Sequence, residues 1–209
     1  MSDTFTEADL EPSDNDRRRA RHDAIDRAAA AIAVLSAGLV VGGLVALGAC
    51  AAPFVFRLTP APASGFAMGA AFARFDRIAI GAAAVALGAE LVRTFLARRR
   101  PPTIAARLRR FAAMALAGAA TWMGTTVSPA ITELYAAGAR RETASTAGPG
   151  AELGASLDAL HRRAEAIGKL EVGLALTLVA LHVFTIRRAS EDDDPDDVAP
   201  VPLPPGPRG

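Results

Sequence analysis

The chain has 209 residues, of which 51% are hydrophobic but only 5% aromatic, and its formal net charge is +1. Small aliphatic side chains in this proportion suit close helix packing in lipid better than the core of a soluble protein. The single cysteine, Cys50, excludes an intramolecular disulfide, and together with three scattered histidines it cannot build a structural zinc site.

Residues 1–27 precede the first apolar stretch and are rich in charge. Acidic and polar residues occupy the first 16 positions, and five arginines follow before the stretch begins. A segment of high charge and low hydrophobicity cannot bury enough apolar surface to fold. We therefore predict a disordered cytoplasmic tail with a basic flank over residues 1–27.

Four apolar stretches follow in the chain. Residues 28–56 contain 29 positions without a formal charge, and residues 111–132 contain 22. Residues 78–96 are interrupted by two charges, and residues 172–186 are 15 long. Because about 20 residues at about 1.5 Å rise cross the hydrocarbon, two stretches qualify alone and two need their flanking turns. We predict an all-α four-helix transmembrane bundle over residues 28–188, with spans at about 29–53, 76–97, 108–131 and 166–187.

The distribution of arginine predicts the orientation of these spans. Residues 93–110 contain seven arginines and no acidic residue. Short loops rich in Lys and Arg stay cytoplasmic, and the basic flank of the first span and the Arg187–Arg188 pair lie on the same side by parity. We expect a multi-pass protein of the cell membrane with both termini cytoplasmic. Residues 189–209 are acidic and then proline-rich, and we predict that they form a second disordered tail.

An internal repeat relates the two halves of the membrane domain. An offset of 89 residues aligns Arg74 with Arg163 and Asp76 with Glu165. Two helix hairpins repeated in the same orientation would be related by an axis along the membrane normal. A tandem duplication is one explanation, and chance alignment in a sequence made mostly of Ala, Leu and Arg is the other.

Five short motifs carry a resemblance to a known family. They are APFVFR at 52–57, SGFAMG at 64–69, FARFD at 72–76, VSPAI at 127–131 and LHRR at 160–163. Their order and spacing, over roughly residues 28–188, resemble the transmembrane protein 205-like family, an uncharacterised domain. The resemblance implies a four-helix integral membrane protein without an assigned catalytic residue or substrate; animal members are associated with drug resistance and secretory trafficking. The long polar tails and the glycine-containing loop at 148–150 depart from the family pattern.

Charged side chains within and beside the spans are the candidate site residues. Glu90 and Arg93 share a helix face and are expected to form an intramembrane ion pair, with structural anchoring as the main role and a proton or cation site at Glu90 as the alternative. At the outer mouth, pseudo-symmetry would gather a polar cup. Its residues are Arg74, Asp76, Arg163, Glu165 and Lys169, the last two at the spacing of a helical ion pair. Snorkelling side chains would explain the same residues without a function, and a substrate or ion vestibule or a partner contact are the other interpretations.

Glycines predict where helices approach closely. Gly38 and Gly42 form a G-x-x-x-G step in the first span, and Gly81 and Gly88 lie on nearly one face of the second. We expect them to pack these two spans together, with contact between two chains of a homo-oligomer as the alternative.

No catalytic or metal-binding pattern accompanies these features. His161 and His182 are 21 residues apart on one predicted helix, about 30 Å, so they cannot bind one metal together. We expect His182 to be a neutral interfacial side chain and predict no catalytic residue, no metal and no cofactor. The chain also lacks H-E-x-x-H, G-x-S-x-G and P-loop patterns.

These observations favour a non-enzymatic integral membrane protein with a transport-like or scaffold role. The alternative is a membrane-embedded haem or metal redox protein. The expected partners are the lipid bilayer, a second copy of the chain and a small molecule or ion of unknown identity; no nucleic acid is expected.

Overall fold

The computed structural model describes residues 13–96, 103–139 and 150–191, and these residues form four long helical rods. The first rod joins α1 (Asp14–Val45), the π-helical segment η2 (Ala46–Ala51) and α2 (Ala52–Leu58). The second is α3 (Ala63–Leu96), and the fourth is α6 (Ala151–Glu191). The third joins α4 (Ile104–Trp122), the π-helical segment η3 (Met123–Val127) and α5 (Ser128–Ala136). The predicted all-α bundle is therefore confirmed.

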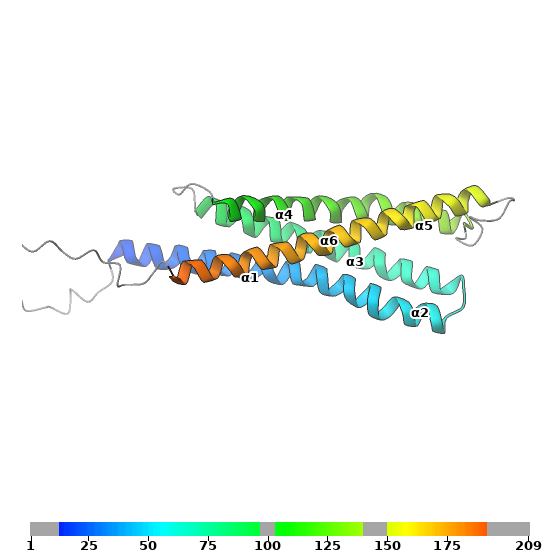
Figure 1. Ribbon diagram of the computed structural model, residues 1–209, viewed down its shortest axis with the longest axis horizontal. Helices are drawn as coiled ribbons and strands as arrows, with labels where there is room; N and C mark the ends of the chain where they lie inside the picture. The colour runs from blue at the N-terminus through cyan, green and yellow to red at the C-terminus, as the bar shows by residue number, and fades with distance from the viewer. Residues whose placement is uncertain (1–12, 97–102, 140–149, 192–209) are drawn as a thin grey trace, which may run out of the picture.

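The four rods run side by side along the long axis of the molecule (Figure 1). The start of α1, the end of α3, the start of α4 and the end of α6 gather at one end of the bundle, on the left of the view. The contacts between α1 and α3, between α3 and α4, and between α6 and both α1 and α4 close the bundle into a ring. Side chains of all four rods can therefore meet near its axis.

The first helix begins earlier than the sequence suggests. Ser13 caps α1: its hydroxyl accepts a hydrogen bond from the Asp16 amide at 3.2 Å, and the Asp16 carboxylate accepts one from the Ser13 amide at 3.2 Å. This reciprocal capping box satisfies amide groups that a helix start leaves unpaired. The predicted disordered tail must be corrected over residues 14–27, which are helical. Residues 1–12 and 192–209 lie outside the described residues.

Each proline inside a rod follows a π-helical segment. Pro53 lies in the first turn of α2 after η2, and Pro129 lies in the first turn of α5 after η3. Proline lacks an amide hydrogen and its ring clashes with the carbonyl group one turn before it. A wider local turn accommodates that clash, so both helices continue past the proline.

The core of the bundle consists mainly of alanine. The largest cluster contains buried residues of all four rods: Ala37, Val40, Phe75, Ala79, Ala82, Ala83, Ala86, Ala112, Ala113, Leu116, Ala120, Ala175 and Leu178. Large apolar side chains point outward instead, and Leu35, Phe111 and Phe184 are each more than 60% exposed. This inverted pattern is expected where the surrounding solvent is lipid.

Three of the rods contain helices long and apolar enough to cross a membrane: Asp14–Leu58, Ala63–Leu96 and Ala151–Thr185. The rod from α4 to α5 is not among them, and its sequence contains polar residues that include Thr121, Thr125 and Thr132. Each of these hydroxyls donates a hydrogen bond to the carbonyl oxygen four residues earlier. The described part of the chain thus contains three clear candidate spans where the sequence predicted four.

The predicted glycine contact between the first two spans is wrong. A Cβ atom added at Gly38, Gly42, Gly81 or Gly88 would meet no heavy atom within 4 Å, apart from its own helix backbone and chain neighbours. These four glycines are exposed, because alanines occupy the face where α1 meets α3. A different glycine, Gly43, makes the close approach, and its position lies directly over the Phe75 ring.

Candidate functional site

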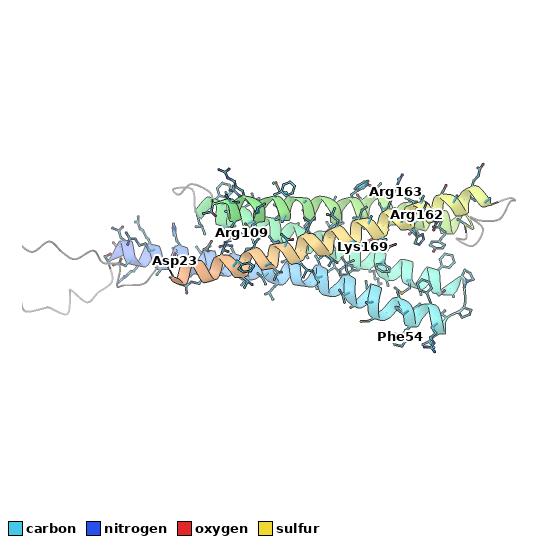
Figure 2. The ribbon with its side chains drawn as sticks, viewed as in Figure 1. Asp23, Phe54, Arg109, Arg162, Arg163 and Lys169 are labelled. Carbon is cyan, nitrogen blue, oxygen red and sulfur yellow. The ribbon has the colours of Figure 1, made fainter. Side chains whose placement is uncertain are left out.

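A cluster of ionisable side chains lies near the end of the bundle where α1 begins, and all of them are buried or nearly so except Asp26, whose side chain is 41% exposed. We call Asp26, Glu90, Arg93, Arg109 and His182 the charge cluster. Asp26 comes from α1, Glu90 and Arg93 from α3, Arg109 from α4 and His182 from α6, so every rod contributes. Figure 2 shows Arg109 in this part of the molecule.

Glu90 is the centre of the charge cluster. Its side chain is 2% exposed, and its carboxylate lies 3.3 Å from Arg109 Nε, 3.8 Å from Arg93 Nη1 and 2.9 Å from His182 Nε2. The predicted Glu90–Arg93 pair is confirmed, but it is the longest of the three contacts. The shorter ones come from α4 and α6, which the spacing within α3 could not reveal.

Arg93 connects three of the rods. Its Nε and Nη2 atoms donate to the two carboxylate oxygens of Asp26, at 2.7 and 3.0 Å, and its Nη1 lies 2.9 Å from His182 Nδ1. A fork of two parallel hydrogen bonds is the strong form of an arginine–carboxylate pair. Asp26 lies within the stretch predicted as a tail, so this partner was missed.

His182 is a core residue, and the prediction of an interfacial side chain is wrong. It is 0% exposed. Because Arg93 can only donate, Nδ1 of His182 is assigned as the acceptor, which puts the ring proton on Nε2, facing Glu90. Both ring nitrogens therefore face protein groups, and neither is directed to an open position where a metal could bind.

The formal charges of the cluster balance. Two carboxylates face two guanidinium groups around a histidine, and Arg109 also donates to Thr185 Oγ1 at 2.8 Å. Buried charges are tolerated when they are paired and hydrogen-bonded in this way. Since the partners come from four rods, the cluster constrains the rotation of each rod about its axis.

A second set of buried polar groups lies further along the bundle. We call Asp76 and Glu171 the acidic pair; their residues are 6% and 2% exposed. Asp76 lies 14 residues before Glu90 on α3, about 21 Å along the helix axis. Its carboxylate accepts a hydrogen bond from the Ser128 hydroxyl. Glu171 is buried on α6, which packs against α5, the helix that begins at Ser128. Oε1 of Glu171 has no hydrogen-bond partner among the described residues. Oε1 of Glu90 and Nε2 of His182 also lack a well-aligned hydrogen bond there, but these two atoms lie 2.9 Å from each other.

The predicted polar cup is not assembled as expected. Asp76 is the only buried one of its five residues; Arg74, Arg163, Glu165 and Lys169 are exposed. The predicted ion pair between Glu165 and Lys169 is confirmed at 2.7 Å, but it lies on the outside of α6. Figure 2 shows Arg163 and Lys169 along this part of α6. Asp76 therefore meets Ser128 and Glu171 in place of the predicted cup residues.

Helical spacing explains which acidic residues face inward. Buried residues of α3 and α6 recur at intervals of three and four, which keeps them on one face of each helix. On α3 they include Asp76, Ala79, Ala83, Ala86 and Glu90; on α6 they include Glu171, Ala175, Leu178 and His182. Glu165 and Lys169 are out of phase with that face. This spacing is the sequence signal that could have identified Glu171 and His182.

Other candidate metal ligands are dispersed. His161 Nδ1 lies 2.9 Å from the Leu157 carbonyl oxygen, and its ring packs edge-on against Tyr135. Cys50 is exposed on the first rod. In the described ranges no group of three or more His, Cys, Asp or Glu residues is placed to hold a metal ion.

The apolar exterior, the alanine core and the enclosed charges together define a membrane-embedded helical bundle. The chain belongs to the family described as a domain of unknown function, DUF4149, whose sequence profile matches residues 35–140. The matched region contains Asp76, Glu90, Arg93, Arg109 and Ser128, whereas α6 and Asp26 lie outside it. No curated protein and no solved structure matches the chain.

Proposed function

We propose that the chain is a four-pass, non-enzymatic protein of the cell membrane with a transport-like role. The observation that carries this proposal is the acidic pair, two carboxylates enclosed by helices whose outer surface is apolar. Ionisable groups inside a membrane bundle are expensive, and they commonly mark ion or substrate pathways. The narrower resemblance to the transmembrane protein 205-like family is part of this proposal and is consistent with a four-helix membrane domain.

Four passes are supported by the third rod. From Ile104 to Ala136 it has 33 residues, about 50 Å along a continuous helix axis, which exceeds the thickness of the hydrocarbon core. It packs against both α3 and α6. The shared end of α1 and α6 in Figure 1 is consistent with both termini being on one side, and the arginines at 93–110 favour the cytoplasm for that side.

A scaffold role is the second candidate, and the charge cluster favours it. A cluster that is balanced and shared by all rods stabilises one arrangement of helices without requiring a ligand. The acidic pair favours transport over a scaffold role, because no arginine or lysine among the described residues pairs with its carboxyl groups. The redox alternative is disfavoured by His182, since both of its ring nitrogens face Glu90 and Arg93.

Ion flux through purified protein in liposomes tests the transport role. Proteoliposomes loaded with a dye sensitive to protons, sodium or potassium would receive, in separate experiments, a gradient of the matching ion. We expect flux above that of protein-free liposomes, and its loss in Glu171→Gln. Glu165→Gln is the matched control, because it removes an exposed carboxylate from the same helix. Flux equal to that of protein-free liposomes under every gradient would reject the transport role and leave the scaffold role.

A further inference from the structure

We propose that the acidic pair is a proton-binding site, in which Glu171 carries one exchangeable proton. The proton is then the ion of the proposed transport role. Proton binding itself does not depend on transport; only the use that the protein makes of the site rests on the proposed function. The site is defined by three side chains from three helices, namely Asp76 of α3, Ser128 of α5 and Glu171 of α6.

Burial and unmet hydrogen bonding distinguish this site from a surface acidic cluster. The Glu171 residue is 98% buried, counted as the remainder of its 2% exposure, and its Oε1 lacks a hydrogen-bond partner among the described residues. Ser128 donates its hydroxyl proton to Asp76, which orients that carboxyl group. A buried carboxylate oxygen without a donor is unstable. A proton bound to Glu171 would remove this buried negative charge.

The surrounding charges do not neutralise the acidic pair. Arg74 and Arg77 of α3 are exposed, and so are Arg163 and Lys169 of α6, the latter paired with Glu165. Residues 28–56 of the first rod carry no charge, and neither do residues 111–132 of the third. Among the described residues, no lysine or arginine forms an ion pair with Asp76 or Glu171. Burial without a positive partner favours the neutral, protonated form of a carboxyl group.

The charge cluster provides an internal comparison. There Glu90 is also buried, but Arg93 and Arg109 lie within 4 Å of its carboxylate. The same bundle can therefore accommodate arginine beside a buried acid. At the acidic pair the described neighbours of Asp76 are Ser128, Gly124 and Ile80, none of which carries a charge, so a proton takes the role that arginine has at Glu90.

The backbone of the third rod is adapted to the site. Gly124 lies in the π-helical segment η3, and a Cβ atom there would be 3.2 Å from Asp76 Cβ and 2.8 Å from Ile80 Cδ1. Glycine therefore permits η3 to approach α3 beside the acidic pair. Ser128 follows η3 directly, so the wider turn sets the position of the hydroxyl that reaches Asp76. Single π-helical turns are frequent at functional sites.

Infrared difference spectroscopy of the full chain in lipid nanodiscs tests the site. Spectra would be recorded between about pH 5 and about pH 8, in H₂O and in D₂O. We expect the carbonyl stretch of a protonated carboxyl group that shifts in D₂O and changes with pH. The double variant Asp76→Asn with Glu171→Gln should lose this band, whereas Glu165→Gln should retain it. Absence of the band in the wild type, or its persistence in the double variant, would overturn the proposal.

A second measurement on the wild type covers the case in which the double variant does not fold. Dicyclohexylcarbodiimide reacts with protonated carboxyl groups in apolar surroundings, and mass spectrometry locates the adduct. We expect modification at Glu171 or Asp76 that declines as the pH rises, and none at Glu165. An unmodified acidic pair would overturn the proposal. So would a carboxyl band that sodium or potassium abolishes at constant pH, because the site would then bind an alkali cation.

The two proposals fail separately. A titrating carboxyl band together with liposomes that show no flux would reject transport and leave the proton site intact. Flux without a titrating band would retain transport and reject this site.

Discussion

At the scale of single residues, Glu90 is the side chain on which the charge cluster depends. It is the carboxylate that Arg109 contacts at 3.3 Å and His182 at 2.9 Å, and Arg93 is also within 4 Å. Its removal leaves two guanidinium groups enclosed with only Asp26 to balance them. An unbalanced buried charge costs more than the pair contributed, so Glu90 is expected to matter more than any exposed carboxylate.

Glu90→Gln should destabilise the bundle by about 3–5 kcal/mol, because it removes one partner of a buried ion pair. Glu165→Gln removes an exposed partner and should change the free energy of unfolding by about 1 kcal/mol or less. Denaturant unfolding in detergent, followed by circular dichroism, measures both. Equal stability of the two variants would show that the charge cluster does not hold the rods together.

At the scale of helices, Gly43 and Gly42 give a direct test of the packing between α1 and α3. They are neighbours on one helix, but the Phe75 ring occupies the space beside Gly43, whereas Gly42 faces open space. The same substitution therefore has the same effect on helix propensity at both positions. Only at Gly43 does the new side chain meet Phe75.

Gly43→Val should destabilise the bundle by about 1–3 kcal/mol through overpacking against Phe75. Gly42→Val should be neutral or slightly stabilising, because glycine in a helix interior is itself unfavourable. Thermal unfolding of the two variants in the same detergent makes the comparison. A larger loss at Gly42 than at Gly43 would contradict the described contact between α1 and α3.

Local spacing predicted much of the helical structure but only part of the sites. The Glu90–Arg93 and Glu165–Lys169 contacts depend on intervals of three and four residues along one helix, and both are present. Asp26 and Arg109 reach Glu90 or Arg93 from other helices, so finding them requires the rotation of each helix about its axis. The prediction that Gly38 and Gly42 pack against the second span failed for the same reason. A G-x-x-x-G motif indicates a helix face of small residues, but it does not identify the helix that packs against that face.

At the scale of the whole molecule, the bundle separates two kinds of buried charge. The charge cluster lies near the end where α1 begins. Asp76 of the acidic pair lies about 21 Å from Glu90, towards the start of α3. An alanine core occupies the length between them, as Ala79, Ala83 and Ala86 do on α3. The charge cluster therefore holds the helices together at one position along the bundle axis, and the proposed proton site lies at another. It requires that all four rods cross the membrane.

Cysteine labelling in intact cells tests that requirement most directly. In a Cys50→Ser background, which removes the single native cysteine, Ala63→Cys, Ile104→Cys and Ala137→Cys place exposed reporters at the start of α3, the start of α4 and just after α5. A four-pass bundle with cytoplasmic termini predicts that a membrane-impermeant maleimide labels positions 63 and 137 from outside, and position 104 only after the cells are opened. Labelling of 104 and 137 from the same side would show that the third rod does not cross the membrane and would contradict the four-pass bundle.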